Sequence, residues 1–387
     1  KKRLLSFVAK YMYDNGDSDY SYAVDYVDLL GYFKDYLKTR FPFQPQKVLE
    51  DFIKRGILTY RDENLIRFKS AFFFHYFLAL HFDYDPSFKE EVFTGEKYLS
   101  FVEEITYYTG LKRDDISVLR FTQEKLNEAF GEFNEDIRNN YEKVDRVLES
   151  RKDNTVTFQI DEKKAESKLS ENQIDELYDN SLSAIPVSKI IEKKDNVNQH
   201  TRRQIDKVLK LACNVLKNSE DVDDFEVKKH AYQNTLISSI SFLMQYRDSL
   251  ITHYIKFKKQ PDHFPKNINF HIFIKVIPLI HQVVIFNWLG TQKLRPVITK
   301  KIEKDVMTLN ISDFEKFLSI FIYGDVKGGD YPQIIEKFVK STRFNYLKDL
   351  SYLKILSYYH LRNNGRDLDK FYLKLMADIQ QDIGQLD

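Results

Sequence analysis

The spacing of apolar residues along this chain is mostly that of α-helices. Over residues 346–359, apolar side chains recur three or four positions apart, as they do along one face of an amphipathic helix. The same rhythm runs through residues 204–217 and 231–257. Ser312, with Glu315 three positions later, is typical of a capping box at a helix start. This spacing predicts a mainly α-helical protein. The chain has only 12 Gly and 9 Pro in 387 residues, and so few glycines disfavour nucleotide enzymes that are built on Gly-rich loops.

Composition narrows the functions that the chain can carry. It has 59 Lys and Arg against 58 Asp and Glu, and its net charge of +1 disfavours a broadly basic nucleic-acid binder while leaving room for a local basic patch. The single cysteine, Cys213, allows no internal disulfide and argues against a cysteine-based zinc site. The histidines at 253, 263, 271 and 281 lack the close pair spacing typical of metal ligands.

The sequence also lacks the motifs of common catalytic sites. It contains no G-x-x-x-x-G-K-[ST] phosphate loop, no G-x-S-x-G, no H-E-x-x-H and no EF-hand pattern. Its one glycine cluster, residues 324–329, is not followed by Lys and Ser or Thr and predicts a polar turn. We therefore predict no catalytic residue and no metal ligand, and we do not expect this chain itself to be an enzyme.

Residues 1–82 read as a winged-helix-like domain. Helices are expected over residues 4–13, within 20–40 and over 45–55, where Gly56 is a typical C-terminal capping glycine. Two short alternating runs, residues 56–60 and 65–68, flank a polar turn and predict a β-hairpin. A densely aromatic closing helix follows over residues 68–82. Its run from Phe72 to Phe77 is aromatic on all sides, which favours a helix buried all round over one that stacks on a ligand.

The rest of the chain divides by composition. We expect a helical extension over residues 83–138 and a charged connector over 139–203, where aromatic residues nearly vanish. We expect residues 204–387 to form an α-helical domain, which could stack helix pairs as a solenoid. The longest apolar stretch, residues 276–289, is interrupted by polar residues and falls short of the roughly 20 residues of a membrane span, so it predicts a buried helix.

One segment resembles a known family. Residues 52–79 contain Gly56-Ile57-Leu58, Ile66-Arg67-Phe68 and Tyr76-Phe77-Leu78-Ala79, which resemble the end of the winged-helix module in NACHT-type STAND NTPases. Residues 105–111, Ile-Thr-Tyr-Tyr-Thr-Gly-Leu, resemble an element found downstream of that module. The resemblance covers about residues 48–111, with fainter similarity to about residue 260.

The resemblance implies a role in signalling. STAND proteins join an effector, a P-loop NTPase, a winged helix and a helical sensor, and many bacterial members act in antiphage defence. A ligand on the sensor releases autoinhibition and drives oligomerisation. Because the chain has no initiator Met and no phosphate loop, we expect it to be the non-catalytic winged helix and sensor of a longer cytoplasmic protein.

The resemblance also implies partners. They would be an upstream NTPase module that binds ATP or ADP with Mg, a trigger such as a phage-derived protein, and further copies of the protein. No membrane is expected, and nucleic acid is the least favoured partner.

Two groups of residues are candidate binding sites. In the family a histidine between the wing and the next helix contacts the nucleotide, and its position here is Ser70, with Lys69 able to supply charge. The resemblance thus implies nucleotide sensing by Lys69 and Ser70, and it puts His75 where the family has an acidic residue. Separately, cations alternate with apolar residues in two clusters, which predict either a solvated helix face or a patch for an acidic partner. These cations are Lys256, Lys258, Lys259, Lys293 and Arg295.

Two alternative functions stay open. The chain could be a helical protein–protein scaffold without an NTPase. It could also be a winged-helix DNA-binding regulator that reads duplex DNA with residues 45–55. That helix offers Gln46, Lys47, Lys54 and Arg55, but it also carries Glu50 and Asp51, which repel phosphates.

Overall fold

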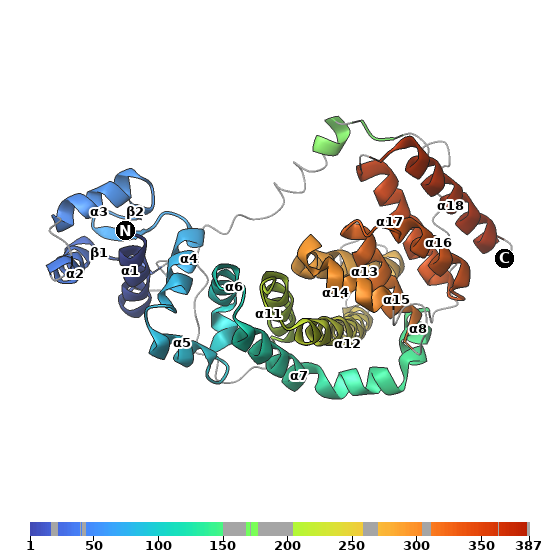
Figure 1. Ribbon diagram of the computed structural model, residues 1–387, viewed down its shortest axis with the longest axis horizontal. Helices are drawn as coiled ribbons and strands as arrows, with labels where there is room; N and C mark the ends of the chain where they lie inside the picture. The colour runs from blue at the N-terminus through green and yellow to red at the C-terminus, as the bar shows by residue number, and fades with distance from the viewer. Residues whose placement is uncertain are drawn as a thin grey trace. The chain divides into compact units, whose positions relative to one another are not determined.

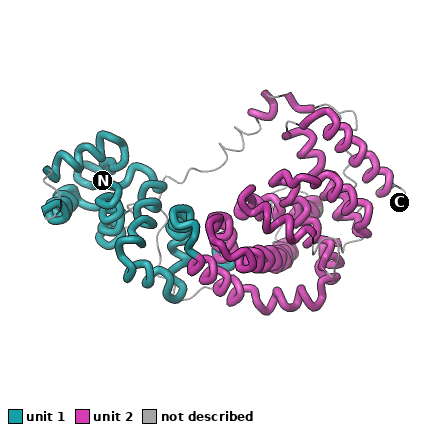
Figure 2. The backbone as a smooth tube through the Cα atoms, viewed as in Figure 1, with its two compact units in different colours: residues 1–115, 185–207 teal, residues 116–184, 208–387 magenta. Residues whose placement is uncertain are grey.

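The computed structural model describes residues 1–16, 22–38, 40, 44–149, 168–170, 172–176, 204–257, 270–303, 311–362 and 364–384. Its contacts divide the chain into two compact units (Figure 2). Unit 1 comprises Lys1–Asp115 and Ile185–Lys207, and unit 2 comprises Ile116–Ala184 and Val208–Asp387. Most described residues are helical (Figure 1), which confirms the mainly α-helical fold. The predicted domain boundary at residue 203 lies outside the described residues. The predicted boundaries at residues 82 and 138 do not coincide with the division into two units. The predicted organisation into four parts stays a prediction.

Unit 1 opens with helices around a small sheet. Its first elements are α1 (Lys2–Asn15), β1 (Val24–Asp25), α2 (Tyr26–Lys38), α3 (Pro45–Lys54), β2 (Leu58–Tyr60) and β3 (Leu65–Phe68). The strands are antiparallel in the order β1-β3-β2, and Leu58 pairs with Phe68 in the predicted hairpin. β1, which pairs Val24 with Ile66, falls where a helix was expected, because two residues are too short to show an alternating pattern. The unit continues through α4 (Ala71–His81), α5 (Pro86–Phe93), η2 (Lys97–Ser100) and α6 (Val102–Leu111).

Gly56 ends α3 as predicted. Its φ of 67° lies in the left-handed region that favours glycine. The Gly56 amide donates to the Ile53 carbonyl at 2.9 Å, and the Ile57 amide donates to the Phe52 carbonyl at 3.0 Å. This pair of bonds is a Schellman motif, which satisfies carbonyls that the helix end would leave free and turns the chain directly into β2.

Aromatic side chains form the core of unit 1 around α4, which packs against α1 and α6. Phe74 is fully buried and stacks on Tyr22, with 5.0 Å between ring centroids. Phe77 stacks on Phe68 of β3 at 5.8 Å. The prediction of a helix buried all round is wrong for Phe72, whose side chain is 50% exposed. Neighbouring elements cover the Phe74 and Phe77 faces of α4 and leave the Phe72 face to solvent.

Unit 2 is built from helices. They are α7 (Ile116–Asn139), α8 (Tyr141–Glu149), α11 (Ile205–Asn218), α12 (Phe225–Phe257), α13 (Phe270–Leu289), η5 (Gln292–Leu294), α14 (Arg295–Lys301), α15 (Asp313–Asp325), α16 (Tyr331–Ser341), α17 (Asn345–Leu361) and α18 (Arg366–Gly384). The first turn of α11 belongs to unit 1. α12 contacts α7, α13, α14 and α15, so it lies at the centre of the unit, while consecutive helices from α15 to α18 contact one another. α8 falls inside the predicted charged connector.

The apolar stretch near residue 280 is part of α13, which begins earlier than predicted. Within the described residues, one helical window, Ile272–Leu289, is long and apolar enough to cross a membrane by length and composition. The helix contacts α12, α15 and α17, and its buried residues include His281 and Gln282. Only 33% of the window is buried, and Ile280 and Val283 are exposed. The predicted burial therefore applies to one face of the helix.

A buried polar seam joins α7 to α12. The Asn134 amide donates to Ser238 Oγ at 2.9 Å and its carbonyl oxygen accepts from Ser241 Oγ at 2.7 Å. Earlier on α7, Gln123 Oε1 accepts from the Asn234 amide at 3.0 Å. Buried polar side chains are costly unless they are hydrogen-bonded, so these pairs select one register of the two helices.

Removing Asn134 tests this seam. Asn134→Ala should lower the free energy of unfolding by about 2–3 kcal/mol, because it opens a small cavity and leaves Ser238 and Ser241 without this partner. Glu135→Ala, at the adjacent exposed position, is the matched control and should stay within about 0.5 kcal/mol of the wild type. Urea denaturation followed by circular dichroism measures both. Equal effects of the two substitutions would contradict a stabilising seam.

Candidate functional site

Lys69 and Ser70 lie together at the junction between β3 and α4, and both are exposed. The Lys69 amide donates to the Ile57 carbonyl at 2.9 Å, which extends the hairpin ladder by one bond. The Lys69 ammonium lies over the turn at Gly56, where an added Cβ would come within 3.4 Å of Nζ. Ser70 is the N-cap of α4, and its hydroxyl accepts from the Phe72 amide at 3.3 Å. The hydroxyl therefore has a local structural role and keeps a hydrogen to donate.

His75, one turn further along α4, holds a buried carboxylate. Its Nδ1 lies 2.8 Å from Glu104 Oε1 on α6, and the Glu104 side chain is fully buried. A carboxylate in that environment needs a hydrogen-bonding partner, and the imidazole supplies one. His75 therefore links α4 to α6. The role of Glu104 could not be predicted from the sequence, because its neighbour on α6 is another glutamate and only the fold distinguishes them.

The predicted cation clusters of unit 2 lie on separate elements. Lys256 is exposed in the last turn of α12, and Lys258 and Lys259 lie outside the described residues. Lys293 on η5 forms an ion pair with Glu220, so its charge is neutralised locally. Arg295 begins α14, and its Nη2 comes within 3.7 Å of where a Cβ at Gly329 would be. Binding of a partner by these residues stays a prediction.

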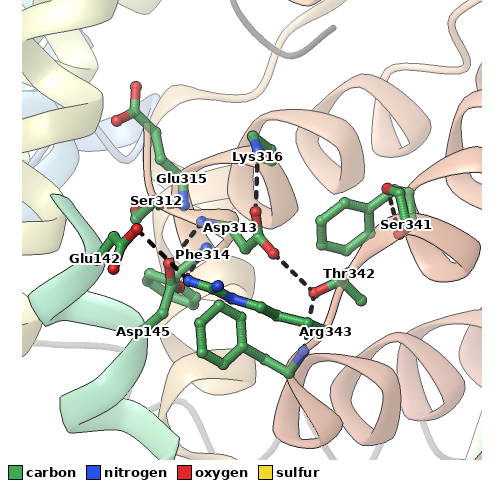
Figure 3. A network of polar contacts seen from close by, with 12 residues as sticks. Glu142, Asp145, Ser312, Asp313, Phe314, Glu315, Lys316, Ser341, Thr342 and Arg343 are labelled. Atoms are coloured by element: carbon green, nitrogen blue, oxygen red, sulfur yellow. Dashed lines mark hydrogen bonds and ion pairs between the residues drawn. The ribbon is translucent and has the colours of Figure 1, made fainter. Parts of the chain in front are cut away.

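A buried carboxylate on α8 anchors that helix to the rest of unit 2 (Figure 3). Asp145 is 2% exposed, and its two oxygens accept from the backbone amides of Asp313 at 2.7 Å and Phe314 at 2.9 Å. The Tyr346 hydroxyl on α17 also donates to it, at 3.0 Å. The amides belong to the first turn of α15, where free N–H groups and the helix dipole favour an anion. One side chain thus joins α8, α15 and α17.

The other polar groups at the start of α15 form hydrogen bonds and ion pairs with neighbouring residues. Ser312 is the N-cap, as predicted, and its hydroxyl accepts from the Glu315 amide at 3.1 Å. Asp313 accepts from the Thr342 hydroxyl at 3.0 Å and pairs with Lys316 at 2.9 Å (Figure 3). These contacts leave Asp145 as the group that ties α15 to α8.

A third buried carboxylate lies at the other end of α15. Asp325 pairs with Lys354 at 3.0 Å and with Arg362 at 2.9 Å, and its side chain is 5% exposed. Gln282 on α13 also donates to Asp325, at 2.9 Å. The glycine cluster predicted a polar turn over residues 324–329, but Gly324 and Asp325 are the last residues of α15 and the turn begins after them. Asp325 therefore joins α15 to α13 and to α17 with its C-cap, rather than facing solvent.

The buried carboxylates Glu104, Asp145 and Asp325 each link helices within one unit. Throughout the described ranges, His, Cys, Asp and Glu side chains form no group of three that could hold a metal ion. Cys213 is fully buried, and burial raises the pKa of its thiol. The groups gathered around Asp145 and Asp325 satisfy one another and show no arrangement of nucleophile and base.

Comparison with known proteins gives one family match. A family model described as Novel STAND NTPase 4 matches residues 22–78. The match spans β1, α2, α3, the β2–β3 hairpin and most of α4, and it includes Lys69 and Ser70. This part of the chain is therefore related to STAND NTPases. No curated protein and no solved structure matches the chain.

The His75–Glu104 contact should contribute to the stability of unit 1. We expect His75→Ala to lower the free energy of unfolding by about 2 kcal/mol, because a fully buried carboxyl loses a hydrogen-bonding partner. The double variant His75→Ala/Glu104→Leu should recover part of this loss, since the buried carboxyl is then gone. Hydrogen exchange of the α4 and α6 amides reports the change locally. Additive effects of the two substitutions would show that the two side chains are not coupled.

Asp145 should make the stability of unit 2 depend on pH. Burial raises the pKa of this carboxyl to about 6 from an ordinary 3.8, although the two amides and the Tyr346 hydroxyl oppose the rise. The folded chain then binds more protons than the unfolded chain between these values, so stability falls as pH rises through the window. We expect a fall of about 1–3 kcal/mol relative to Asp145→Asn.

Urea denaturation at a series of pH values measures this dependence. Glu149→Gln, which removes an exposed carboxylate from the same helix, is the control and should keep the wild-type profile. An unchanged profile in Asp145→Asn would show that this carboxyl is already ionised at low pH.

Proposed function

We propose that this chain is a non-catalytic regulatory and sensor portion of a bacterial STAND NTPase of the NACHT type that acts in antiphage defence. The observation that carries the proposal is the family match over residues 22–78. The matched region contains the sheet of unit 1, and the order helix, strand, two helices and hairpin is the one expected of a winged helix. Unit 2, a helical body on the same chain, supports the role of sensor.

In this proposal the nucleotide chemistry belongs to an upstream NTPase module. That module would bind ATP or ADP with Mg, since residues 1–387 contain no phosphate loop. Lys69 and Ser70 would face the nucleotide from the winged helix. Their exposure at the N-terminus of α4 supports this role, because an ammonium and a hydroxyl suit a phosphate. Lys69 would contribute most of the effect, since Ser70 already caps the helix.

The helical unit would recognise the trigger. We infer that the surface of residues 204–387 binds a phage-derived protein and that binding releases the NTPase to oligomerise in the cytoplasm. The buried anchors at Asp145 and Asp325 support this role, because they hold several helices in one arrangement that a ligand could stabilise or displace. Lys256 and Arg295 are the predicted cations that this surface would offer to an acidic partner, whereas Lys293 would first have to leave Glu220.

The carboxylates of α3 argue against the alternative in which this helix reads duplex DNA. Glu50 accepts from Gln46 at 3.0 Å, and Asp51 pairs with Lys1 and Arg55, each at 2.8 Å. A helix that reads duplex DNA presents free cations and amides to the groove. Here two carboxylates occupy that helix and engage part of its polar surface. A scaffold without an NTPase is distinguished from our proposal by the experiment that follows.

The test uses the full-length gene product. The coding sequence upstream of Lys1 should contain a phosphate loop, and the full-length protein should retain ADP or ATP. Lys69→Ala should weaken nucleotide binding about tenfold, the expected effect of losing one charge-assisted contact. Lys34→Ala, an exposed lysine on α2, is the matched control and should bind as the wild type does. An upstream region without a phosphate loop would overturn the proposal and favour the scaffold.

A further inference from the structure

A groove opens in unit 1 between the start of α1, the end of α2 and the start of α3. It has a volume of about 860 Å³. Its lining includes the apolar side chains of Leu4, Leu37 and Val48. Leu4 and Leu37 are 5% and 4% exposed, so they form a floor that belongs to the core, and Val48 is half-buried. The groove therefore has an apolar base that a ligand can cover.

Cations surround this apolar floor. Arg3, Arg40 and Lys47 line the groove, and all three are exposed. The Arg40 guanidinium lies 4.3 Å from the centre of the Tyr36 ring and donates to the Tyr36 carbonyl at 3.3 Å, so it is held in place. Arg3 lies 4.9 Å from the centre of the Tyr84 ring. Of the charged residues that the structure describes, none forms a carboxylate ion pair with these three cations.

Among the described residues that line the groove, the carboxylate of Asp51 is already engaged. Asp51 pairs with Lys1 and with Arg55, each at 2.8 Å. Hydrogen bonds from Lys1 and Arg55 hold the pKa of Asp51 below its ordinary value, so the carboxylate stays ionised and committed to them. The groove therefore keeps an uncompensated positive rim on an apolar floor.

We propose that this groove binds an acidic protein segment that carries apolar side chains. Glutamate or aspartate side chains on the segment would pair with Arg3, Arg40 and Lys47, and its leucine-like side chains would cover Leu4, Leu37 and Val48. A nucleic acid fits less well, because a phosphate backbone offers nothing to cover the apolar floor and would approach Asp51. The proposal is independent of the proposed function, since it requires neither a nucleotide nor an upstream NTPase module.

The test uses the 387-residue chain and fluorescein-labelled synthetic peptides. The probe has leucines at helical spacing with glutamates between them. One control peptide carries lysine in place of glutamate, a second carries serine in place of leucine, and a labelled DNA duplex is the third comparison. Fluorescence anisotropy measures the affinity of each. We expect the probe to bind more tightly than all three comparisons and to weaken as salt is raised.

Charge reversal locates the binding site. Arg40→Glu/Lys47→Glu should weaken binding of the probe about tenfold, because each lost pair changes to a repulsion. Lys34→Glu/Lys54→Glu changes two exposed lysines of α2 and α3 outside the groove lining by the same total charge and should bind as the wild type does. Lys47→Glu alone leaves the Arg40–Tyr36 contact intact and should weaken binding of the probe about threefold. This single variant replaces Arg40→Glu/Lys47→Glu in the test if the double variant does not fold.

Three outcomes would overturn the proposal. They are equal weakening by the two charge reversals, equal binding of the leucine and serine peptides, and tighter binding of the DNA duplex than of the probe. The last would assign the groove to nucleic acid instead. None of these results depends on an upstream NTPase module, so failure of the groove proposal is distinguishable from failure of the proposed function.

Discussion

Buried carboxylates are the constraint on which both units depend. Glu104, Asp145 and Asp325 have little or no contact with solvent, and each takes its hydrogen bonds from another element. An ionised carboxylate in an apolar interior is costly unless such partners are in place. The folded state therefore keeps each of these carboxyls beside its partners. This requirement ties α4 to α6 in unit 1, and α8, α13 and α17 to α15 in unit 2.

The two ends of α15 show how the same residue type is stabilised in different ways. At its start, Asp145 meets backbone amides and the positive end of the helix dipole. At its end, where the dipole would repel an anion, Asp325 is compensated by Lys354 and Arg362. α15 is thus held at both termini by charges, while aromatic side chains of its middle, such as Phe317 and Phe321, are buried in the core.

Helical segments of this protein could be predicted well from the sequence. The N-cap at Ser312 and the capping glycine at Gly56 mark helix ends by local chemistry, and the structure has both where predicted. The Glu315 side chain pairs with Lys301, so the second half of the predicted capping box is not formed. β1 could not be predicted, because a two-residue strand exists only through its pairing with β3. The exposure of Phe72 was also missed, since an all-aromatic helix gives no sign of which face its neighbours leave open.

The candidate sites divide in the same way. Lys69 and Ser70 come from a resemblance over a short segment, and the structure brings them together because they are adjacent in the chain. Other features join residues that are far apart in the sequence. They are the groove lined by Arg3, Arg40 and Lys47, and the buried carboxylates Glu104, Asp145 and Asp325. Local sequence by itself determined the helices, their caps, the hairpin and the kinship of residues 22–78 with STAND NTPases. Only the tertiary structure decided which charges are buried and which stay exposed, because burial depends on packing between distant segments.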